Sequence, residues 1–169
     1  MTEIQAARPA ALAFPDDLQG ADPMALSAQE MQAWSAFLHS HALVARRLEA
    51  ELLSGANLSL AYYDVLVQLA TTEGHELRMH QLADRVVLSR SGVTRLVDRL
   101  EAEGLVSRRV CSSDARGSFA VLTPAGLERL REATPTHLSG VRRHFLAALS
   151  TDDQAELTRL LELVIDRND

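Results

Sequence analysis

The chain has 169 residues, 47% of them hydrophobic, and a formal net charge of −6 at pH 7. This length and composition suit one domain-sized unit with an apolar core. No apolar run is long enough to cross a bilayer, and the N-terminal residues lack the apolar stretch of a signal peptide. The single cysteine excludes an internal disulfide and fits a reducing compartment. We therefore expect a cytoplasmic protein with no membrane partner.

The charge is unevenly distributed along the chain. Residues 78–118 carry eight arginines against five acidic residues, whereas the rest of the chain carries nine against eighteen. A local basic excess on an otherwise acidic chain is typical of a nucleic-acid-binding region. The negative net charge therefore does not exclude DNA as a partner.

The N-terminal third predicts an arm and two helices. Residues 1–26, with Pro9, Pro15 and Pro23, predict a flexible arm. Ser27 and Glu30 form a capping box that opens a long helix over residues 27–57. Its apolar stripe consists of Met31, Trp34, Leu38, Ala42, Ala45, Leu48 and Leu52. Ser59 caps a second helix, with an inward stripe of Leu60, Tyr63, Leu66, Val67 and Ala70. Residues 73–77 are expected to form a loop.

The next segment predicts two helices joined by a tight turn. Residues 79–86 carry a small apolar face of Leu82, Ala83, Val86 and Val87. Ser89 is expected to cap the following helix, Ser91 to Glu103, and Gly104 to end it in the left-handed conformation. The buried face of this helix should consist of Val93, Leu96, Val97 and Leu100.

The outward positions of this second helix point to DNA. They are Arg90, Ser91, Thr94, Arg95, Asp98 and Arg99, with no acidic residue before Asp98. Because the N-terminal part of a recognition helix enters the major groove, we expect Arg90, Ser91, Thr94 and Arg95 to contact bases or phosphates. Ser89 and Arg99 are placed to approach phosphate. Asp98, Glu101 and Glu103 are expected to pair with Arg95 and Arg99.

A β-hairpin follows directly. Residues 106–111 and 118–122 are β-prone, and the SSDARG sequence between them is turn chemistry. Arg116 at the tip is placed to enter a minor groove. Asp114 is expected to hold Arg116, Arg108 or Arg109 by a charge-assisted hydrogen bond. Phe119 is expected to be buried under the hairpin.

Two helices close the chain. Thr123 and Pro124 begin the first as cap and first residue, and Pro135 should interrupt or kink it. Ser150 and Asp153 cap the last helix, whose apolar stripe is Leu157, Leu160, Leu161, Val164 and Ile165. Long apolar helices on both sides of a single DNA-binding segment indicate packing against a second subunit. The DNA-binding segments of the two subunits would then lie about 34 Å apart, which is one turn of DNA.

The sequence resembles the MarR family of winged helix-turn-helix regulators. The matching segments are the LSRSGVTRLVDRLEAEGLVSRR segment, the wing tip Asp114, Ala115 and Arg116, and the LTPAG that opens the next helix. The resemblance covers about residues 27–167. It implies an obligate homodimer on a pseudo-palindromic operator, usually a repressor, released by a small ligand or an oxidant. Many relatives carry two adjacent arginines at the wing tip, where this chain has Arg116 followed by Gly117.

The expected fold is therefore mainly α with a small β-hairpin wing. A winged helix-turn-helix core over residues 58–123 would lie between dimerisation helices at residues 27–57 and 124–169. Within the urate-responsive branch of the MarR family, an Asp on the second long helix and an Arg on the recognition helix take part in ligand response. Asp64 and Arg95 occupy similar places here.

The aromatic residues leave two interpretations open. Trp34, the only tryptophan, and Tyr62 near the start of the second helix indicate either core packing or a pocket for a small aromatic or anionic effector. Trp34, Tyr62, Asp64 and Arg95 are the candidate effector residues. Cys111 is either an inert strand cysteine, which we favour, or a redox-sensitive thiol.

No catalytic motif or zinc-binding spacing is present. We therefore expect no enzyme activity, no metal and no cofactor, and a double-stranded DNA partner. The alternative is a winged-helix protein-interaction module without a specific operator. That alternative would favour exposed Leu, Phe or Tyr at the reading surface rather than Arg, Ser and Thr.

Overall fold

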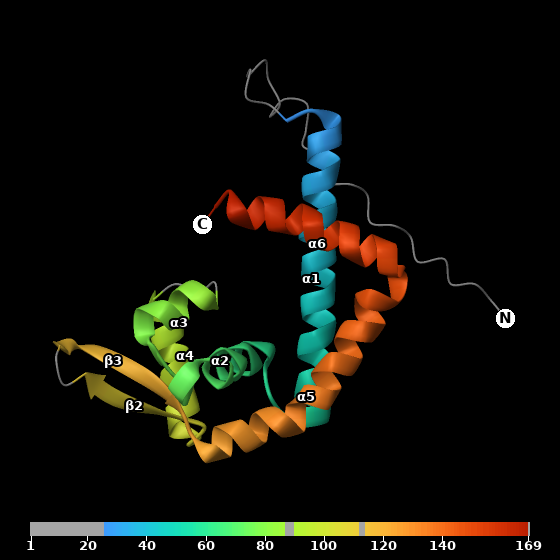
Figure 1. The fold of residues 1–169 in the computed structure, drawn as a ribbon. Coiled ribbons are helices and arrows are strands. Elements are labelled where there is room, and N and C mark those ends of the chain that lie inside the picture. Colours follow the sequence, from blue (N-terminus) through green and yellow to red (C-terminus); the bar gives the residue numbers. More distant parts are fainter. Residues whose placement is uncertain (1–25, 87–89, 112–113, 169) are drawn as a thin grey trace, which may run out of the picture. The chain divides into compact units, whose positions relative to one another are not determined.

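The structure is a computed structural model that describes residues 26–86, 90–111 and 114–168 (Figure 1). The side chains of Arg90, Cys111 and residues 114–117 also lie outside the description. The chain divides into two compact units, residues 1–45 and 46–169, and each is described by itself.

The described part of the first unit is helical. Helix α1 spans Ala28–Ala56, and its residues up to Ala45 belong to this unit. The predicted capping box is confirmed, because the Glu30 carboxylate accepts from the Ser27 N–H at 2.8 Å and the Ser27 hydroxyl accepts from the Glu30 N–H at 3.3 Å. Four large apolar side chains of this segment are exposed: Trp34, Phe37, Leu38 and Leu43.

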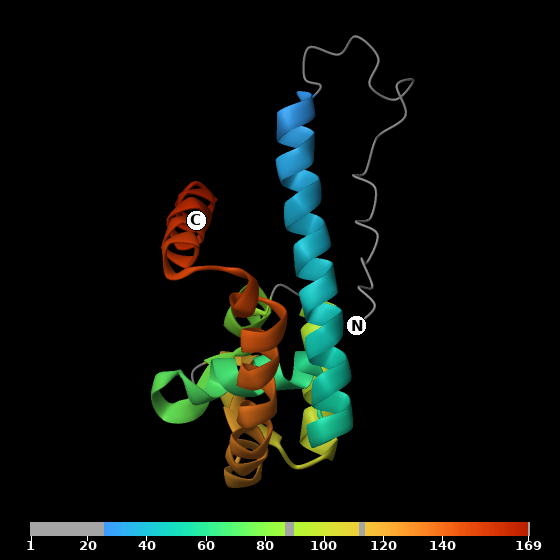
Figure 2. The same cartoon turned by 90° about the vertical axis from the view of Figure 1, so that its right-hand side faces the viewer.

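The second unit contains the remaining elements (Figures 1 and 2). After the end of α1 they are α2 (Leu60–Ala70), η2 (Glu73–His75), β1 (Glu76–Arg78), α3 (Met79–Arg85), α4 (Arg90–Ala102), β2 (Val106–Cys111), β3 (Asp114–Leu122), α5 (Pro124–His144), η3 (Leu146–Ala148) and α6 (Thr151–Asp166). The fold is mainly helical with a small sheet, as the sequence predicts.

The sheet has three antiparallel strands in the order β1-β3-β2. Strand β1 corrects the expected loop at residues 73–77, because only Glu73–His75 form a turn and Glu76–Arg78 pair with β3. Three residues are too few to give a periodic pattern. The strand exists because the edge of β3 satisfies its backbone groups. Gly74, at φ 72°, allows the sharp entry into it.

The core lies between the helices α2–α5 and one face of the sheet. In α2, Tyr63 and Leu66 are buried as expected, and so are Val65 and Leu69, so this helix buries a wider face than the predicted stripe. The other members of the core are Leu52, Leu58, Leu77, Leu82, Ala83, Val93, Val97, Leu100, Leu105, Val106, Ala120, Leu122, Leu130 and Ala133.

Helix α5 begins as predicted but does not stop at Pro135. The Thr123 hydroxyl accepts from the Gly126 N–H at 3.0 Å, with Pro124 in the first turn. The helix then continues to His144, so of the two expected outcomes the interruption at Pro135 is wrong. Figure 1 shows a bend along the length of the helix, which is compatible with the other expected outcome, a kink. Pro135 is exposed, so water can satisfy the carbonyl oxygen that loses its partner.

The C-terminal part of α5 packs against the end of α1 (Figure 2). Glu51 accepts from Arg143 and interacts with His144 Nε2, both at 2.8 Å. The His144 hydrogen bond, with the charges of Arg143 and His144, holds the pKa of the Glu51 carboxyl below its ordinary value. A side chain at Gly140 would collide with Leu48 and Glu51, so this glycine permits the close approach.

Helix α6 exposes its apolar stripe. The Ser150–Asp153 capping box is confirmed, with the Ser150 hydroxyl accepting from the Asp153 N–H at 3.2 Å. No residue of α6 is buried. Its exposed apolar side chains are Leu160, Leu161, Leu163, Val164 and Ile165. Among the described residues, no helix combines the length and apolar character needed to cross a membrane.

Candidate DNA-binding surface

Helix α4 has one buried face and one exposed face. Val93, Val97 and Leu100 are fully buried, and Leu96 packs against them, which confirms the predicted core face. The exposed positions are Ser91, Thr94, Arg95, Asp98, Arg99 and Glu101. Gly104, with φ 73°, follows the helix in the left-handed conformation. The basic and hydroxyl side chains therefore cover the solvent side of the first turns.

The helix before α4 completes a helix-turn-helix unit. Leu82 and Ala83 of α3 are buried in the core. The turn residues 87–89 lie outside the described residues, so the capping role of Ser89 and the burial of Val87 stay predictions. Arg90 begins α4, but its side chain also lies outside the description.

Arg108 of β2 contacts α4 at three points. Its guanidinium group donates to the Thr94 carbonyl oxygen at 3.2 Å and to Glu101 at 3.2 Å, and it forms an ion pair with Asp98 at 2.5 Å. The Arg108 N–H also donates to Glu101 at 3.0 Å. The sequence predicts arginines of α4 itself, Arg95 and Arg99, as partners of these two carboxylates. The structure instead pairs both carboxylates with Arg108 of β2, which compensates their charge.

The side chain of Arg109 lies on the other face of β2. It forms a two-point ion pair with Glu76 of β1, one arm being Arg109 Nε to Glu76 Oε2 at 3.2 Å. The Arg109 hydrogen bond and charge hold the pKa of the Glu76 carboxyl below its ordinary value. Successive side chains of a strand alternate between faces, so two adjacent arginines serve two different partners. The Asp114 side chain lies outside the described residues, so its pairing with Arg108, Arg109 or Arg116 stays a prediction.

The second strand of the wing begins earlier in the sequence than expected. Strand β3 starts at Asp114, so the sequence DARG, taken as part of the turn, belongs to the strand. The ladder is irregular between Val110 and Cys111, with Val110 opposite Ser118 but Cys111 opposite Asp114. Figure 1 shows the hairpin extending beyond helices α2–α4. The side chains of Asp114 and Arg116 lie outside the described residues, so their roles stay predictions.

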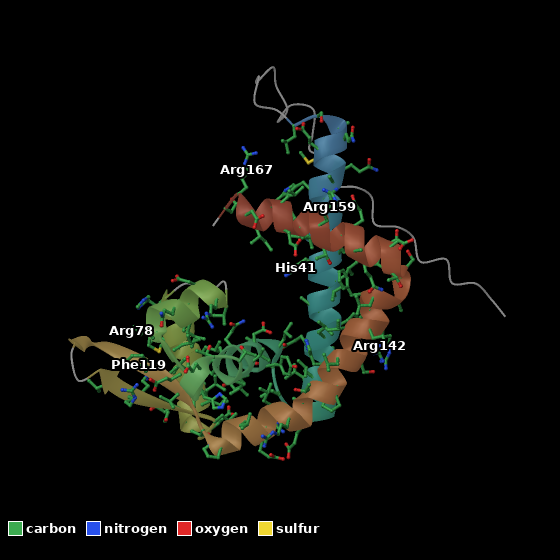
Figure 3. The ribbon with its side chains drawn as sticks, in the orientation of Figure 1. His41, Arg78, Phe119, Arg142, Arg159 and Arg167 are labelled. Atoms are coloured by element: carbon green, nitrogen blue, oxygen red, sulfur yellow. The ribbon has the colours of Figure 1, made fainter. Side chains whose placement is uncertain are left out.

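Phe119 differs from its expected place. It is half-buried rather than enclosed under the hairpin, and the guanidinium groups of Arg78 and Arg109 both lie over its ring. Figure 3 labels Arg78 and Phe119 next to each other on the sheet. Glu76 and Arg78 carry no signal of this role in the sequence, because the three-residue strand β1 has no periodic pattern.

Comparison with known proteins places this geometry in a family. The MarR family model matches residues 56–117. The structure is similar to the crystal structure of AbsC, a MarR family transcriptional regulator from Streptomyces coelicolor, with a TM-score of 0.76 and 37% identity over 84% of this chain and 95% of AbsC. The chain belongs to the MarR family. As such it is a DNA-binding transcriptional regulator and not an enzyme.

Two further relatives are informative about this MarR regulator. Sco3205, a MarR family regulator from Streptomyces coelicolor whose crystal structure is in complex with DNA, has a TM-score of 0.77 and 35% identity over 83% of this chain and 89% of its own. The transcriptional repressor MprA from Escherichia coli is 28% identical over 119 residues, which are 70% of this chain and 67% of MprA. The predicted family and fold class are confirmed.

The candidate effector residues are only partly brought together. Burial raises the pKa of the Tyr62 phenol, and the charge of Glu103 and a hydrogen bond to it raise it further. Tyr62 thus lies near Glu103 and Arg99, at the C-terminal end of α4. Asp64 is exposed as a residue, yet its carboxyl lies close enough to the protein that burial, with nearby Glu49, raises its pKa. Trp34 belongs to the other unit and stacks on Phe37 with ring centroids 6.0 Å apart.

Two histidines have defined surroundings. His137 stacks on Tyr63 with ring centroids 4.2 Å apart, its Nδ1 is buried without a hydrogen-bond partner in the described structure, and burial lowers its pKa. His144 interacts with Glu51. Within the described ranges, no three His, Cys, Asp or Glu side chains come together as metal ligands. Cys111 ends β2, and its side chain lies outside the description.

Proposed function

We propose that this MarR regulator is a homodimeric repressor that binds a pseudo-palindromic operator and is released by a small effector. The observation that carries the proposal is the exposed face of α4. Ser91, Thr94 and Arg95 lie on the solvent side of the helix, opposite the buried Val93 and Val97. These side chains match the donors and acceptors of base edges and phosphates in a major groove.

The assigned contacts follow the helix-turn-helix geometry. Arg90, Ser91, Thr94 and Arg95 would face the major groove, with Ser89 and Arg99 near phosphate. Arg116 would enter the minor groove, braced by Asp114. The DNA complex of Sco3205, 35% identical to this chain, supports a common mode of binding. Repression is suggested by the name of MprA, a transcriptional repressor. Because the partner is DNA, we propose a cytoplasmic location.

The dimer is proposed from the exposed apolar helices. Residues 27–57 and 124–169 are assigned as dimerisation segments around the core at 58–123. Leu160, Leu163 and Val164 of α6 are each exposed by 45% or more. Apolar surface on this scale is stabilised when a second subunit covers it. A closed two-fold dimer would place two copies of α4 about 34 Å apart, at successive major grooves.

The effector is proposed to be a small aromatic or anionic molecule. Asp64, whose carboxyl pKa is raised, Tyr62, Trp34 and Arg95 are its candidate contacts. Isothermal titration of the protein with urate and with salicylate tests this assignment. Heat of binding together with loss of DNA binding supports the assignment. No heat of binding and unchanged DNA binding would exclude urate and salicylate as effectors.

The first test of the function is a fluorescence-anisotropy titration. The full chain is titrated against the intergenic DNA upstream of its own gene and against a scrambled duplex, at physiological salt. A specific regulator is expected to prefer its operator by about a thousandfold, with two subunits bound per site. Equal and weak binding to both duplexes, together with no site recovered in a genome-wide selection, would favour the protein-interaction module instead.

A further inference from the structure

The outer strands of the sheet are tied together across the central one. Strands β1 and β2 do not pair with each other, because β3 lies between them. In the ladder, Phe119 of β3 is directly opposite Arg78 of β1 and also directly opposite Arg109 of β2. The guanidinium carbons of Arg78 and Arg109 lie 5.2 and 4.5 Å from the centroid of the Phe119 ring. Both distances suit attraction between a cation and an aromatic face.

An ion pair makes a second tie across the same strand. Arg109 reaches over β3 to Glu76 of β1, with Nε 3.2 Å from Oε2 and Nη2 bonded to Oε1. A carboxylate that binds a guanidinium group at two points fixes its orientation as well as its position. We call Glu76, Arg78, Arg109 and Phe119 the cross-strand rack.

The rack joins the wing to α3, the first helix of the helix-turn-helix unit. Its β1 members immediately precede α3, which begins at Met79, and its Arg109 and Phe119 lie in the β2–β3 hairpin. On the opposite face of β2, Arg108 holds the hairpin to α4 through Thr94, Asp98 and Glu101. The hairpin is therefore restrained on both faces. Strand β1 pairs only with residues 119–121 of β3, so towards its tip the hairpin is two-stranded. A two-stranded hairpin is at best marginally stable without further restraints.

We propose that the cross-strand rack positions the wing, with Phe119 fixing the direction of the hairpin relative to α3 and α4. This inference rests on the proposed function, in which the tip of that hairpin enters a minor groove. The rack residues are positioning residues. They set where the tip lies before DNA arrives, which lowers the ordering cost of binding.

Hydrogen exchange of the full-length free protein tests the mechanical part. Phe119→Leu keeps apolar volume but removes the aromatic face, whereas Phe119→Tyr keeps the ring. In Phe119→Leu, amides of residues 106–122 are expected to exchange about tenfold faster, while α5 amides and the melting temperature change little. Phe119→Tyr should exchange like the wild type. Unchanged exchange in Phe119→Leu, or equally fast exchange in Phe119→Tyr, overturns the inference.

Glu76→Gln separates positioning from direct DNA contact. Removing one negative charge from the DNA-binding segment should by itself tighten DNA binding. The rack makes the opposite prediction, since Arg109 loses its anchor: operator affinity falls about threefold to tenfold. Glu73→Gln is the matched control, with the same charge change just outside the rack. Tighter operator binding by Glu76→Gln than by Glu73→Gln overturns the inference, because Arg109 would then be a DNA contact restrained by Glu76.

Operator binding by the Phe119 variants, measured beside these two experiments, distinguishes this inference from the proposed function. If the wild-type protein shows no preference for any operator, the proposed function fails, and hydrogen exchange still decides whether the rack orders the wing. If the wild type is specific but Phe119→Leu binds its operator as tightly as Phe119→Tyr, the proposed function stands and the positioning role is wrong. Should Phe119→Leu fail to fold, the comparison of Glu76→Gln with Glu73→Gln decides alone.

Discussion

Adjacent residues in this protein act on different partners when they lie in a strand. Arg108 contacts Thr94, Asp98 and Glu101 of α4, while Arg109 contacts Glu76 and Phe119 on the other face of the sheet. The alternation of side chains along a strand imposes this division. A basic pair in a wing sequence therefore does not by itself indicate two DNA contacts.

Arg116 is the residue whose loss should most directly affect the wing contact. Arg116→Ala is expected to weaken operator binding by roughly 1–3 kcal/mol, because the proposed charged contact in the minor groove would be lost. Fluorescence anisotropy at several salt concentrations measures the change. Arg131→Ala removes an arginine of α5 that pairs with Glu128 and serves as the control. Unaltered affinity in Arg116→Ala would show that the wing assignment is wrong.

Glu51 links stability to pH at a single contact. Its carboxyl pKa lies below the ordinary value of 4.5, through the hydrogen bond to His144 and the charge of Arg143. A carboxyl with a lowered folded-state pKa contributes stability that is complete above the unfolded-state pKa and is lost as pH falls through the folded one. The stability advantage of the wild type over Glu51→Gln should therefore shrink below pH 4.5. Thermal melts of both proteins between neutral and acidic pH measure it, and a constant difference would contradict the assignment.

The start of α5 depends on a glycine for a reason that concerns packing between elements. A Cβ at Gly126 would lie 2.0 Å from the Leu105 carbonyl oxygen and 2.9 Å from a Leu122 methyl. The Thr123 N–H also donates to that same carbonyl at 3.2 Å. The helix therefore begins pressed against the strands it follows, and Gly126 is required by contact with its neighbours rather than by its own backbone conformation.

Gly126→Ala is expected to destabilise the protein although alanine favours helices. Helix propensity alone predicts a gain of about 1 kcal/mol, whereas overpacking against backbone costs about 1–3 kcal/mol or more. Urea denaturation measures the net change. Gly55→Ala is the matched control, since its Cβ would meet only the Thr136 side chain, at 3.3 Å. A more stable Gly126→Ala protein would mean that α5 can shift away from Leu105.

At the scale of the whole molecule, the exposed apolar stripe of α6 is the surface that the proposed dimer would cover. Leu160→Glu is expected to shift the protein from dimer toward monomer and to weaken operator binding, because a two-fold interface carries the new charge twice. Light scattering measures the mass of the protein in solution, and fluorescence anisotropy measures its affinity for the operator. Thr158→Glu places the same charge elsewhere on the exposed surface of α6. A wild-type protein that is monomeric at micromolar concentration would contradict the proposed dimer.

The sequence by itself determined the elements whose signals are local. The caps at Ser27, Ser59, Thr123 and Ser150 and the left-handed Gly104 act within a few residues of themselves. The buried face of α4 follows from the spacing of its apolar residues along one helix. Because the winged helix-turn-helix is a contiguous segment, its motif and its family resemblance could be read from order alone.

Only the tertiary structure decided what depends on residues distant in sequence. Strand β1 exists because it pairs with β3, which follows it some forty residues later in the sequence. Arg108 contacts α4 because β2 is folded against that helix. The aromatic face of Phe119 meets Arg78 and Arg109 only once three strands are in register. Pro135 is tolerated within α5 because its side of the helix is exposed to water. Such outcomes are set by packing and register between elements, which no local pattern encodes.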